Sequence, residues 1–322
     1  MAAAATLEKI VRRGAILIAL GLCTALPVAA ATRVLVVAGL GGEPQYEQNF
    51  EDWSAQVAKA STSVTGDPAL VQRLAGRDAV RGNIMAALRK AAQELHGGDH
   101  FVLVLIGHGS FDGTDYRFNI PGDDITGAEM LELLNHFPEG VTQLVVDATS
   151  TSGAIADKWA SPRRVVITAT RTGGERNATR FGGYWAEALT DSAADRDKDG
   201  SVTAEEAFDY ANGKVTESFK SDAAIATEHP RLVGTDAGRI VVARLGAAAL
   251  FASDKQLAAL RVEQDGIEQR IDAVRAQKDS LSADDYYARL EPVLLDMARL
   301  GQRIDARLAQ LGVNAGGGDG GT

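Results

Sequence analysis

The sequence predicts an α/β protein, a three-layer α/β/α sandwich on a mostly parallel β-sheet. Almost entirely apolar runs occur at 34–38, 101–106, 143–146 and 165–169, and amphipathic segments separate them. Runs without polar alternation are typical of strands buried on both faces, and intervening helices connect parallel strands. A hydrophobic content of 45% in 322 residues suits one large domain plus an appendage.

The first segment of the chain is typical of an export signal. Lys9, Arg12 and Arg13 precede an apolar run over 14–26, and small residues follow that run. The run is shorter than the about 20 residues that a membrane-spanning helix needs. We therefore expect residues 1–31 to be a cleaved signal peptide and the protein to be periplasmic or secreted, with a retained anchor as the alternative.

Loss of this leader would change both the thiol content and the charge. Cys23, the single cysteine, lies inside it, so the remaining chain could form no disulfide. The chain has a net charge of -10 and the leader carries +2, which leaves -12. An acidic surface argues against nucleic acid or anionic lipid as a partner. We also expect no stable membrane span in the mature form.

After the leader, strands and helices are expected to alternate up to residue 245. The predicted helices cover 46–58, 78–95, 128–135, 181–193 and 204–220. In open α/β sheets, ligand sites lie beyond the carboxyl ends of the strands. His108 follows the strand at 101–106 and Ser150 follows the strand at 143–146. Both side chains are therefore predicted at the same edge of the sheet.

These residues carry a resemblance to a known fold. The run FVLVLI followed by Gly107-His108-Gly109, and then by a strand and the turn Thr149-Ser150-Thr151-Ser152-Gly153, resembles caspase/legumain-like (clan CD) peptidases. The resemblance covers residues 33–244, and uncharacterised exported bacterial proteins of this fold are the most similar. It implies a catalytic pair in which His108 is the histidine and Ser150 stands where the family has its cysteine.

Because the thiol is missing, two functions have to be weighed. A cysteine needs only modest activation by histidine, whereas a serine needs a hydrogen-bonded base that a third group orients. Asp112 is close to His108 in sequence, but no pattern directs it to the ring. The leading interpretation is a pseudopeptidase that binds a peptide or protein without cleaving it. The alternative is a hydrolase with Ser150 as nucleophile and His108 as base, and hydroxyl side chains in such a turn can also serve the backbone.

A second motif predicts a metal site. Residues 195–206 match the 12-residue EF-hand loop, with Asp195, Asp197 and Asp199 at positions 1, 3 and 5. The remaining matches are Gly200 at position 6, the Ser201 carbonyl at 7, Thr203 at 9 and Glu206 at 12. These oxygen donors favour Ca²⁺. We expect a structural calcium clamp flanked by helices, and the alternative is an acidic turn that opens a helix.

The C-terminal part is charged and helically periodic. One apolar stripe is Leu260, Ile267, Ile271 and Val274, and the other is Leu290, Met297, Leu300, Ile304 and Leu308. A break at 279–285 between them predicts an antiparallel helical hairpin over 253–312 after a small-residue connector. Pro292 requires a kink or a helix start near it. A third possible function is a scaffold that binds a partner, or itself, through this hairpin. The Gly-rich tail 313–322 is expected to be disordered.

Overall fold

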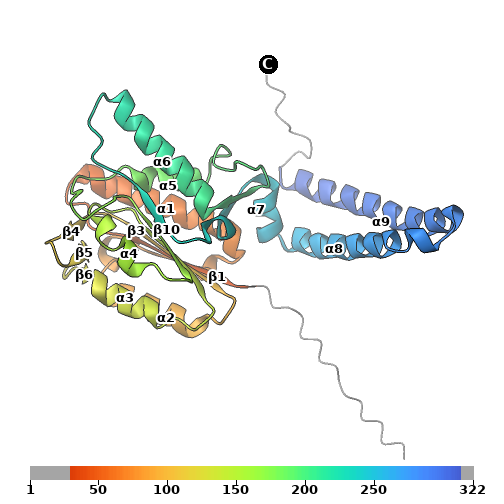
Figure 1. Cartoon of the computed structure of the whole chain (residues 1–322), viewed down its shortest axis with the longest axis horizontal. Helices are drawn as coiled ribbons and strands as arrows, with labels where there is room; N and C mark the ends of the chain where they lie inside the picture. Colours follow the sequence, from red (N-terminus) through yellow and green to blue (C-terminus); the bar gives the residue numbers. More distant parts are fainter. Residues whose placement is uncertain (1–29, 313–322) are drawn as a thin grey trace, which may run out of the picture. The chain divides into compact units, whose positions relative to one another are not determined.

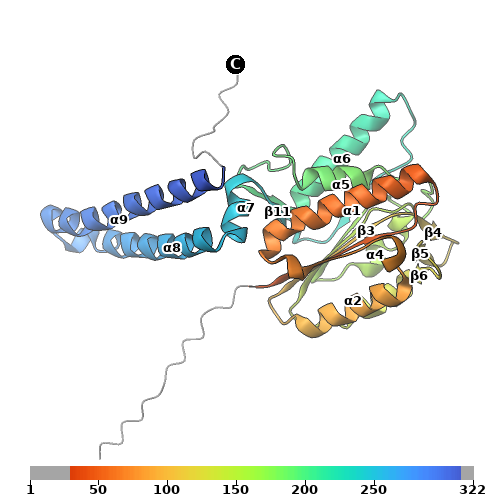
Figure 2. The same ribbon diagram turned by 180° about the vertical axis from the view of Figure 1, so that it is seen from behind.

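A computed structural model describes residues 30–312. The strands of its central sheet form where the sequence is continuously apolar: every residue of β3 (His100–Ile106) after His100 is buried. Alternate side chains of a strand point to opposite faces, so β3 contributes to two separate cores. Helices cover both faces, which confirms the three-layer α/β/α sandwich (Figures 1 and 2).

The central sheet has six strands in the order β10-β8-β7-β3-β1-β2. Five of them run parallel, and only β10 pairs in the antiparallel direction, at one edge. Besides β3 the strands are β1 (Thr32–Ala38), β2 (Val71–Leu74), β7 (Thr142–Asp147), β8 (Arg164–Thr168) and β10 (Arg231–Val233). The order fits the expected parallel sheet, and β2 and β10 are edge strands for which no apolar run was found.

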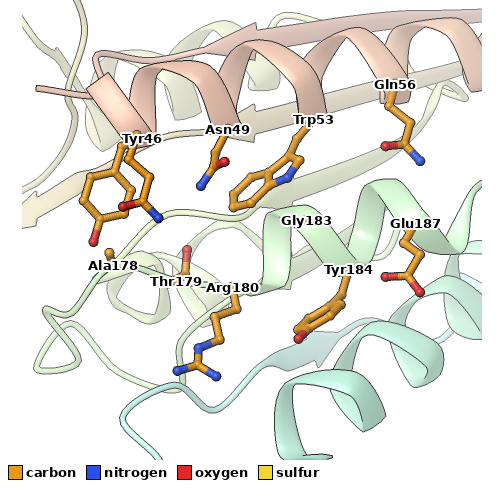
Figure 3. A pocket seen from close by; sticks show the side chains of 11 residues that line it. Tyr46, Asn49, Trp53, Gln56, Ala178, Thr179, Arg180, Gly183, Tyr184 and Glu187 are labelled. Atoms are coloured by element: carbon orange, nitrogen blue, oxygen red, sulfur yellow. The ribbon is translucent and has the colours of Figure 1, made fainter. Parts of the chain in front are cut away.

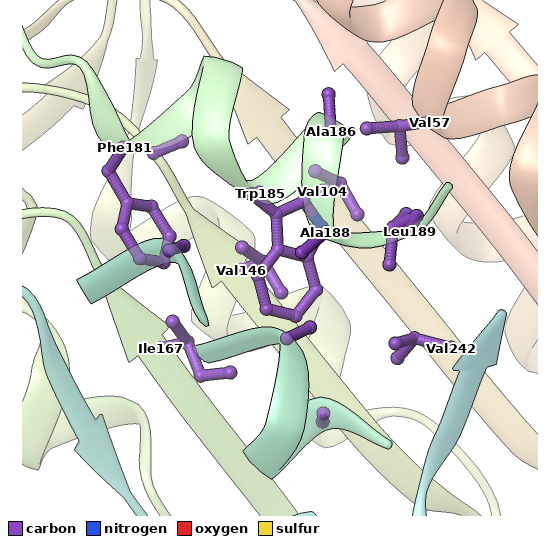
Figure 4. Packing of buried hydrophobic residues seen from close by; sticks show 14 of the residues in the cluster. Val57, Val104, Val146, Ile167, Phe181, Trp185, Ala186, Ala188, Leu189 and Val242 are labelled. Atoms are coloured by element: carbon purple, nitrogen blue, oxygen red, sulfur yellow. The ribbon is translucent and has the colours of Figure 1, made fainter. Parts of the chain in front are cut away.

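One face of the sheet is covered by α1 (Pro44–Thr65), α5 (Phe181–Ala188) and α6 (Ala204–Ser221). Trp185 of α5 is buried there among aliphatic side chains from α1, β3, β7 and β8 (Figure 4). The other face carries α2 (Arg81–Glu94), α3 (Gly127–Asn135) and the single turn α4 (Ala156–Trp159). Hydrophobic burial on both sides of one sheet is the main stabilising contribution to this arrangement.

Two smaller sheets flank the central one. The first is antiparallel and joins β4 (Gly109–Phe111), β5 (Tyr116–Phe118) and β6 (Ile125–Thr126). The second pairs β9 (Ser201–Thr203) with β11 (Val241–Arg244). Short 3-10 turns complete the domain at Pro68–Leu70, Gly76–Asp78, Ser152–Ala154 and Ala237–Arg239.

The C-terminal helices are α7 (Gly246–Ser253), α8 (Lys255–Arg275) and α9 (Ala283–Gln310), with a 3-10 turn at Lys278–Ser280 between the last two. Hydrogen bonds from Arg303 to Glu263 and from Arg270 to Asp296 show that α8 and α9 run antiparallel. Their shared core includes Leu260, Ile267, Ile271, Leu300 and Leu308. Within the described residues, no helix has the length and apolar character needed to cross a membrane.

Several predicted boundaries were wrong. The helix expected at 181–193 ends at Ala188, because the Glu187 carbonyl accepts the N–H groups of Thr190 and Asp191 in a turn. The connector after residue 245 forms the helix α7. Asp254 follows it and caps the start of α8, because its carboxylate accepts the Leu257 N–H. Of the two settings expected for Pro292, the structure has the one in which the helix continues through it, since Pro292 lies inside α9. The predicted tail 313–322 and nearly all of the predicted leader lie outside the described residues.

Candidate functional sites

The expected edge of the sheet is formed by the loops that leave β1, β3, β7 and β8. Backbone hydrogen bonds continue beyond the strands: Gly39 N–H donates to Ile106, and Ala148 N–H donates to Leu105. His108 leaves β3 and Ser150 leaves β7 at this edge, which is where parallel sheets carry ligand sites.

His108 is half-buried and held by aromatic neighbours. Its ring lies edge-on to Tyr46 and Phe50, with centroids 5.0 Å and 5.1 Å away. Its Nε2 is 3.2 Å from the carbonyl oxygen of Gly41. Because a carbonyl only accepts, Nε2 carries the hydrogen in this contact. The ring is therefore directed towards the loop after β1.

Ser150 is directed elsewhere. Its hydroxyl donates to the carbonyl of Gly109 at 3.0 Å and accepts the Gly109 N–H at 3.2 Å. The side chain is 3% exposed, and a Cβ added to Gly109 would lie 2.4 Å from the Ser150 carbonyl oxygen, so β4 covers the turn closely. Among the hydrogen bonds of the described residues, none joins Ser150 to His108. The two predicted residues share one edge without forming a nucleophile–base pair.

The carboxylate closest to His108 in sequence does not orient it. Asp112 accepts hydrogen bonds from the N–H groups of Asp115 and Thr114 and from Arg117. These bonds, with the backbone N–H of Asp115 first, lower the pKa of Asp112 to about 2. The Asp112 carboxylate therefore stabilises its own loop, and among the hydrogen bonds of residues 30–312 none joins it to the His108 ring.

In the turn 149–153, the hydroxyl groups of Thr149, Ser150 and Ser152 each donate to a backbone carbonyl. Ser152 donates to the carbonyl of Thr149 at 2.8 Å, and Gly153 N–H donates to Thr170. Thr151 has a φ of 60° and its N–H donates to the carbonyl of Glu175 at 2.8 Å. A left-handed threonine is uncommon and persists where surrounding contacts determine it. The hydroxyl-rich turn thus has a structural role.

A buried carboxyl group lies at the end of the strand before this turn, and the sequence pattern did not predict it. Asp147 ends β7 and is fully buried. Its Oδ1 accepts the N–H of Thr149 at 3.1 Å, while its Oδ2 has no hydrogen-bond partner in the described part of the chain. Burial raises the pKa of Asp147 to about 6. The only signal in the sequence was one acidic residue directly after an apolar strand.

A second buried acid, Glu228, positions α5. It accepts the N–H groups of Arg180 and Phe181, both at 2.8 Å, at the start of that helix. Burial raises its pKa to about 7. Next to it, His229 Nδ1 lies 3.1 Å from a carboxylate oxygen of Glu175, the residue that also holds Thr151. These contacts tie the loop after β8 to the turn after β7.

A groove lies between α1 and α5, beside the aromatic cluster of His108. We call it the α1–α5 groove; it has a volume of about 710 Å³. It is lined by Gln45, Tyr46, Asn49, Trp53 and Gln56 from α1 and by Ala178, Thr179, Arg180, Gly183, Tyr184 and Glu187 from α5 and the loop before it (Figure 3). Volumes of this size are typical of ligand pockets. Tyr46 belongs to both the groove and the ring cluster around His108.

The structure brings the three aspartates of the predicted calcium loop together. One carboxylate oxygen from each of Asp195, Asp197 and Asp199 lies within 4.8 Å of the others. Asp195 Oδ2 accepts the Gly200 N–H at 3.0 Å, while the buried Asp195 Oδ1 has no partner among the described residues. Gly200 has a φ of 82°, as the sharp turn at position 6 requires. The unpartnered Asp195 Oδ1 and the three clustered carboxylates fit a Ca²⁺ ion, which prefers oxygen ligands.

The second half of the loop is arranged differently. Ser201 and Thr203 lie in β9, and Thr203 forms a reciprocal cap with Glu206 at the start of α6. Glu206 also accepts the N–H of Arg196 at 3.1 Å across the loop. Glu206 therefore closes the loop through hydrogen bonds and lies outside the group of three aspartates. Because α5 ends at Ala188, a turn, not a helix, precedes Asp195.

Comparisons with known proteins leave the family open. No family model matches the sequence, and no curated protein matches it. Among solved structures, the crystal structure of protein GSU0716 from Geobacter sulfurreducens is similar, with a TM-score of 0.41 and 15% identity. The similarity covers 64% of this chain and 94% of that one. A likeness at this level assigns neither a family nor an activity.

Proposed function

We propose that this protein is an exported, calcium-binding pseudopeptidase of caspase/legumain-like fold, which binds a peptide or protein without cleaving it. The observation that supports this most directly is the engagement of Ser150. Its single hydroxyl proton is donated to the carbonyl of Gly109, and the side chain is 3% exposed beneath β4. A serine nucleophile must instead give that proton to a base and reach its substrate.

The position of His108 supports the same conclusion. The ring nitrogen Nε2 contacts the Gly41 carbonyl, and Asp112 is held by its own loop. A working base needs both a bond to the nucleophile and a group that orients it. The edge of the sheet still carries hydrogen-bonded loops beside the α1–α5 groove, and binding without cleavage requires only such a surface.

Calcium would act as a structural clamp in this proposal. The first ligands would be Asp195, Asp197 and Asp199, whose carboxylates already lie together. Thr203, the Ser201 carbonyl and Glu206 would complete the set, with Glu206 exchanging its hydrogen bonds to Thr203 and Arg196 for the ion. The ion would supply positive charge to a loop whose three aspartates repel one another, and so it would stabilise the fold around β9 and α6. The unpartnered Asp195 Oδ1 supports this assignment.

The test of the catalytic alternative is covalent labelling. Calcium-loaded wild-type protein should hydrolyse neither peptide nor ester libraries and should not react with a fluorophosphonate probe. Ser110→Ala is the matched control, because Ser110 lies on β4 next to the glycine that holds Ser150. Labelling that persists in Ser110→Ala and is lost in Ser150→Ala would establish a serine hydrolase and overturn the proposal.

A scaffold role for the helical hairpin remains a second candidate because apolar side chains are exposed on it. Val262 is 71% exposed on α8, and Leu294 and Leu295 are 46% and 49% exposed on α9. Such side chains are a source of binding energy for a partner helix or a second copy. Substitution of all three by serine should then abolish pull-down of a partner without changing ligand binding in the α/β domain.

A further inference from the structure

The α1–α5 groove has a polar lining whose two charged side chains already have partners within the protein. Arg180 pairs with Asp222 at 2.6 Å and lies over the ring of Phe219. Glu187 accepts the hydroxyl of Tyr210 and pairs with Lys214 at 3.2 Å. Both charged side chains of the groove are therefore neutralised by residues outside its lining. A ligand need not bring a compensating charge.

The groups left to recognise a ligand are mostly side-chain amides on α1. Gln45 and Asn49 line the groove, and among the hydrogen bonds of residues 30–312 none involves either side-chain amide. Gln56, further along, gives its N–H to Thr190 at 3.1 Å and keeps its carbonyl oxygen. Each free amide offers both donors and an acceptor. The main chain of a peptide offers the complementary pair.

The spacing of these amides matches an extended chain. Gln45 and Asn49 are four residues apart, which is about 6 Å along a helix. Two residues of extended chain span about 6.6 Å. From Asn49 to Gln56 the helix rises about 10 Å, close to three extended residues. The whole row from Gln45 to Gln56 corresponds to about five residues of extended peptide.

Trp53 lies between these amides and supplies the apolar part of the groove. Its side chain points from α1 towards α5, as do those of Asn49 and Gln56 (Figure 3). A Cβ added to Gly183 would lie 2.9 Å from the indole ring, so the ring rests on the α5 backbone and is held there. A fixed aromatic surface flanked by amides favours one apolar side chain between main-chain hydrogen bonds.

We propose that the α1–α5 groove binds an extended peptide of about five residues through its main chain, with Gln45 and Asn49 as the hydrogen-bonding residues and Trp53 as the contact for one side chain. This inference rests on the proposed peptide-binding function and assigns it to a surface outside the predicted cleft. The ligand is recognised with little dependence on its sequence, because the principal contacts are to the backbone.

The experiment uses the calcium-loaded full-length protein and a library of N-acetylated, C-amidated pentapeptides. Gln45→Ala and Asn49→Ala should each weaken the tightest binder about fivefold, the usual effect of one hydrogen bond. Gln48→Ala is the matched control, because that residue faces Asp52 on the exposed side of α1. Alanine favours helix, so these variants should fold. N-methylation at alternate positions of the peptide should abolish binding.

The outcomes separate this inference from the proposed function. Peptide binding that the Gln45 and Asn49 variants leave unchanged, and that His108→Ala abolishes, overturns the groove and keeps the pseudopeptidase. Absence of binding by every peptide overturns the proposed function and this assignment with it. Binding of a hexosamine oligosaccharide with the same dependence on Gln45 and Asn49 overturns the peptide as the ligand class.

Discussion

Asp147 shows what burial does to a single side chain. It ends β7 below the turn that carries Ser150, and it accepts one backbone hydrogen bond from Thr149. One bond compensates only part of the cost of removing a carboxylate from water. The native state therefore favours the protonated form, and the pKa rises from 3.8 to about 6. The stability of the fold should depend on this group.

The sign of that dependence follows from the raised pKa. The favourable contribution of protonated Asp147 is complete below about pH 4 and is lost as the pH rises through about 6. Relative to Asp147→Asn, which does not titrate, the wild type should lose up to about 3 kcal/mol of unfolding free energy across this range. Urea unfolding at pH 4, 5, 6 and 7, without calcium, measures the difference.

Asp157 provides a control of opposite sign. It is exposed and pairs with Arg231, whose hydrogen bond lowers its pKa. Its stabilising contribution is present above its unfolded pKa and is lost as the pH falls through the lowered one. Relative to Asp157→Asn, the wild type should lose stability towards acid. A pH-independent difference between wild type and Asp147→Asn would show that the buried carboxyl does not titrate.

Individual site residues differ in how far the sequence could place them. His108 was predicted at the carboxyl edge because it directly follows an apolar strand, and that position is a local property. The partner of Ser150 was not predictable, because it depends on β4 folding back over the turn 41 residues away. The α1–α5 groove joins residues 45–56 to residues 178–187, and no local pattern links those segments.

Among the elements, length determined what could be predicted. Strands of five to seven residues that are buried on both faces left continuous apolar runs, and these were found. Strands β4, β5, β6 and β9 have only two or three residues, too few for a period to be recognised. The predicted end of α5 was wrong because a turn follows Ala188, in which the N–H groups of the turn donate to the Glu187 carbonyl. Such turns depend on tertiary contacts, and helix ends are therefore hard to predict.

The predicted calcium loop is positioned by elements that are distant in sequence. Strand β9 pairs with β11, and Leu245 N–H donates to the Gly200 carbonyl at 2.8 Å. A Cβ added to Gly200 would lie 3.0 Å from the Cβ of Ala248 in α7. The loop thus contacts the segment that leads from the α/β domain into the C-terminal helices. Order in the loop should stabilise that junction.

Calcium is therefore expected to raise the melting temperature. A concentration 100 times the dissociation constant should add about 2.7 kcal/mol if the ion binds only the native state. Glu206→Gln removes one charge and should sharply reduce the calcium-dependent increase in thermal unfolding experiments. Glu205→Gln is the matched control, because this neighbouring carboxylate approaches Gly238 and is not a predicted ligand. An equal increase in both variants would place the ion elsewhere.

At the scale of the whole molecule, the fold is stabilised without covalent links. The α/β domain has two apolar cores, one on each face of a single sheet, and the α8–α9 hairpin has its own. Cys23 is the single cysteine, so no intramolecular disulfide can join these parts. The fold therefore depends on burial and, in our proposal of an exported calcium-binding protein, on one bound ion.

The start of β1 distinguishes the two expected cleavage positions. The Ala31 N–H donates to Asp99 at 2.9 Å, and the Ala31 carbonyl accepts the N–H of His100 at 2.8 Å, just before the strand begins at Thr32. Cleavage before Ala31 would keep both bonds and turn the first into an amine–carboxylate pair, which is the stronger kind. Cleavage after Ala31 would remove both and leave the strand itself complete.

Intact-mass analysis of the exported fraction tests this prediction. The mature protein should begin at Ala31 or Thr32 and should not react with a thiol reagent, because the leader contains Cys23. If Ala31 is the new terminus, Asp99→Asn should lower the melting temperature of the mature form more than that of the uncleaved precursor, since only the mature form carries the amine. Thiol labelling of a membrane-bound form of full mass would contradict export by cleavage.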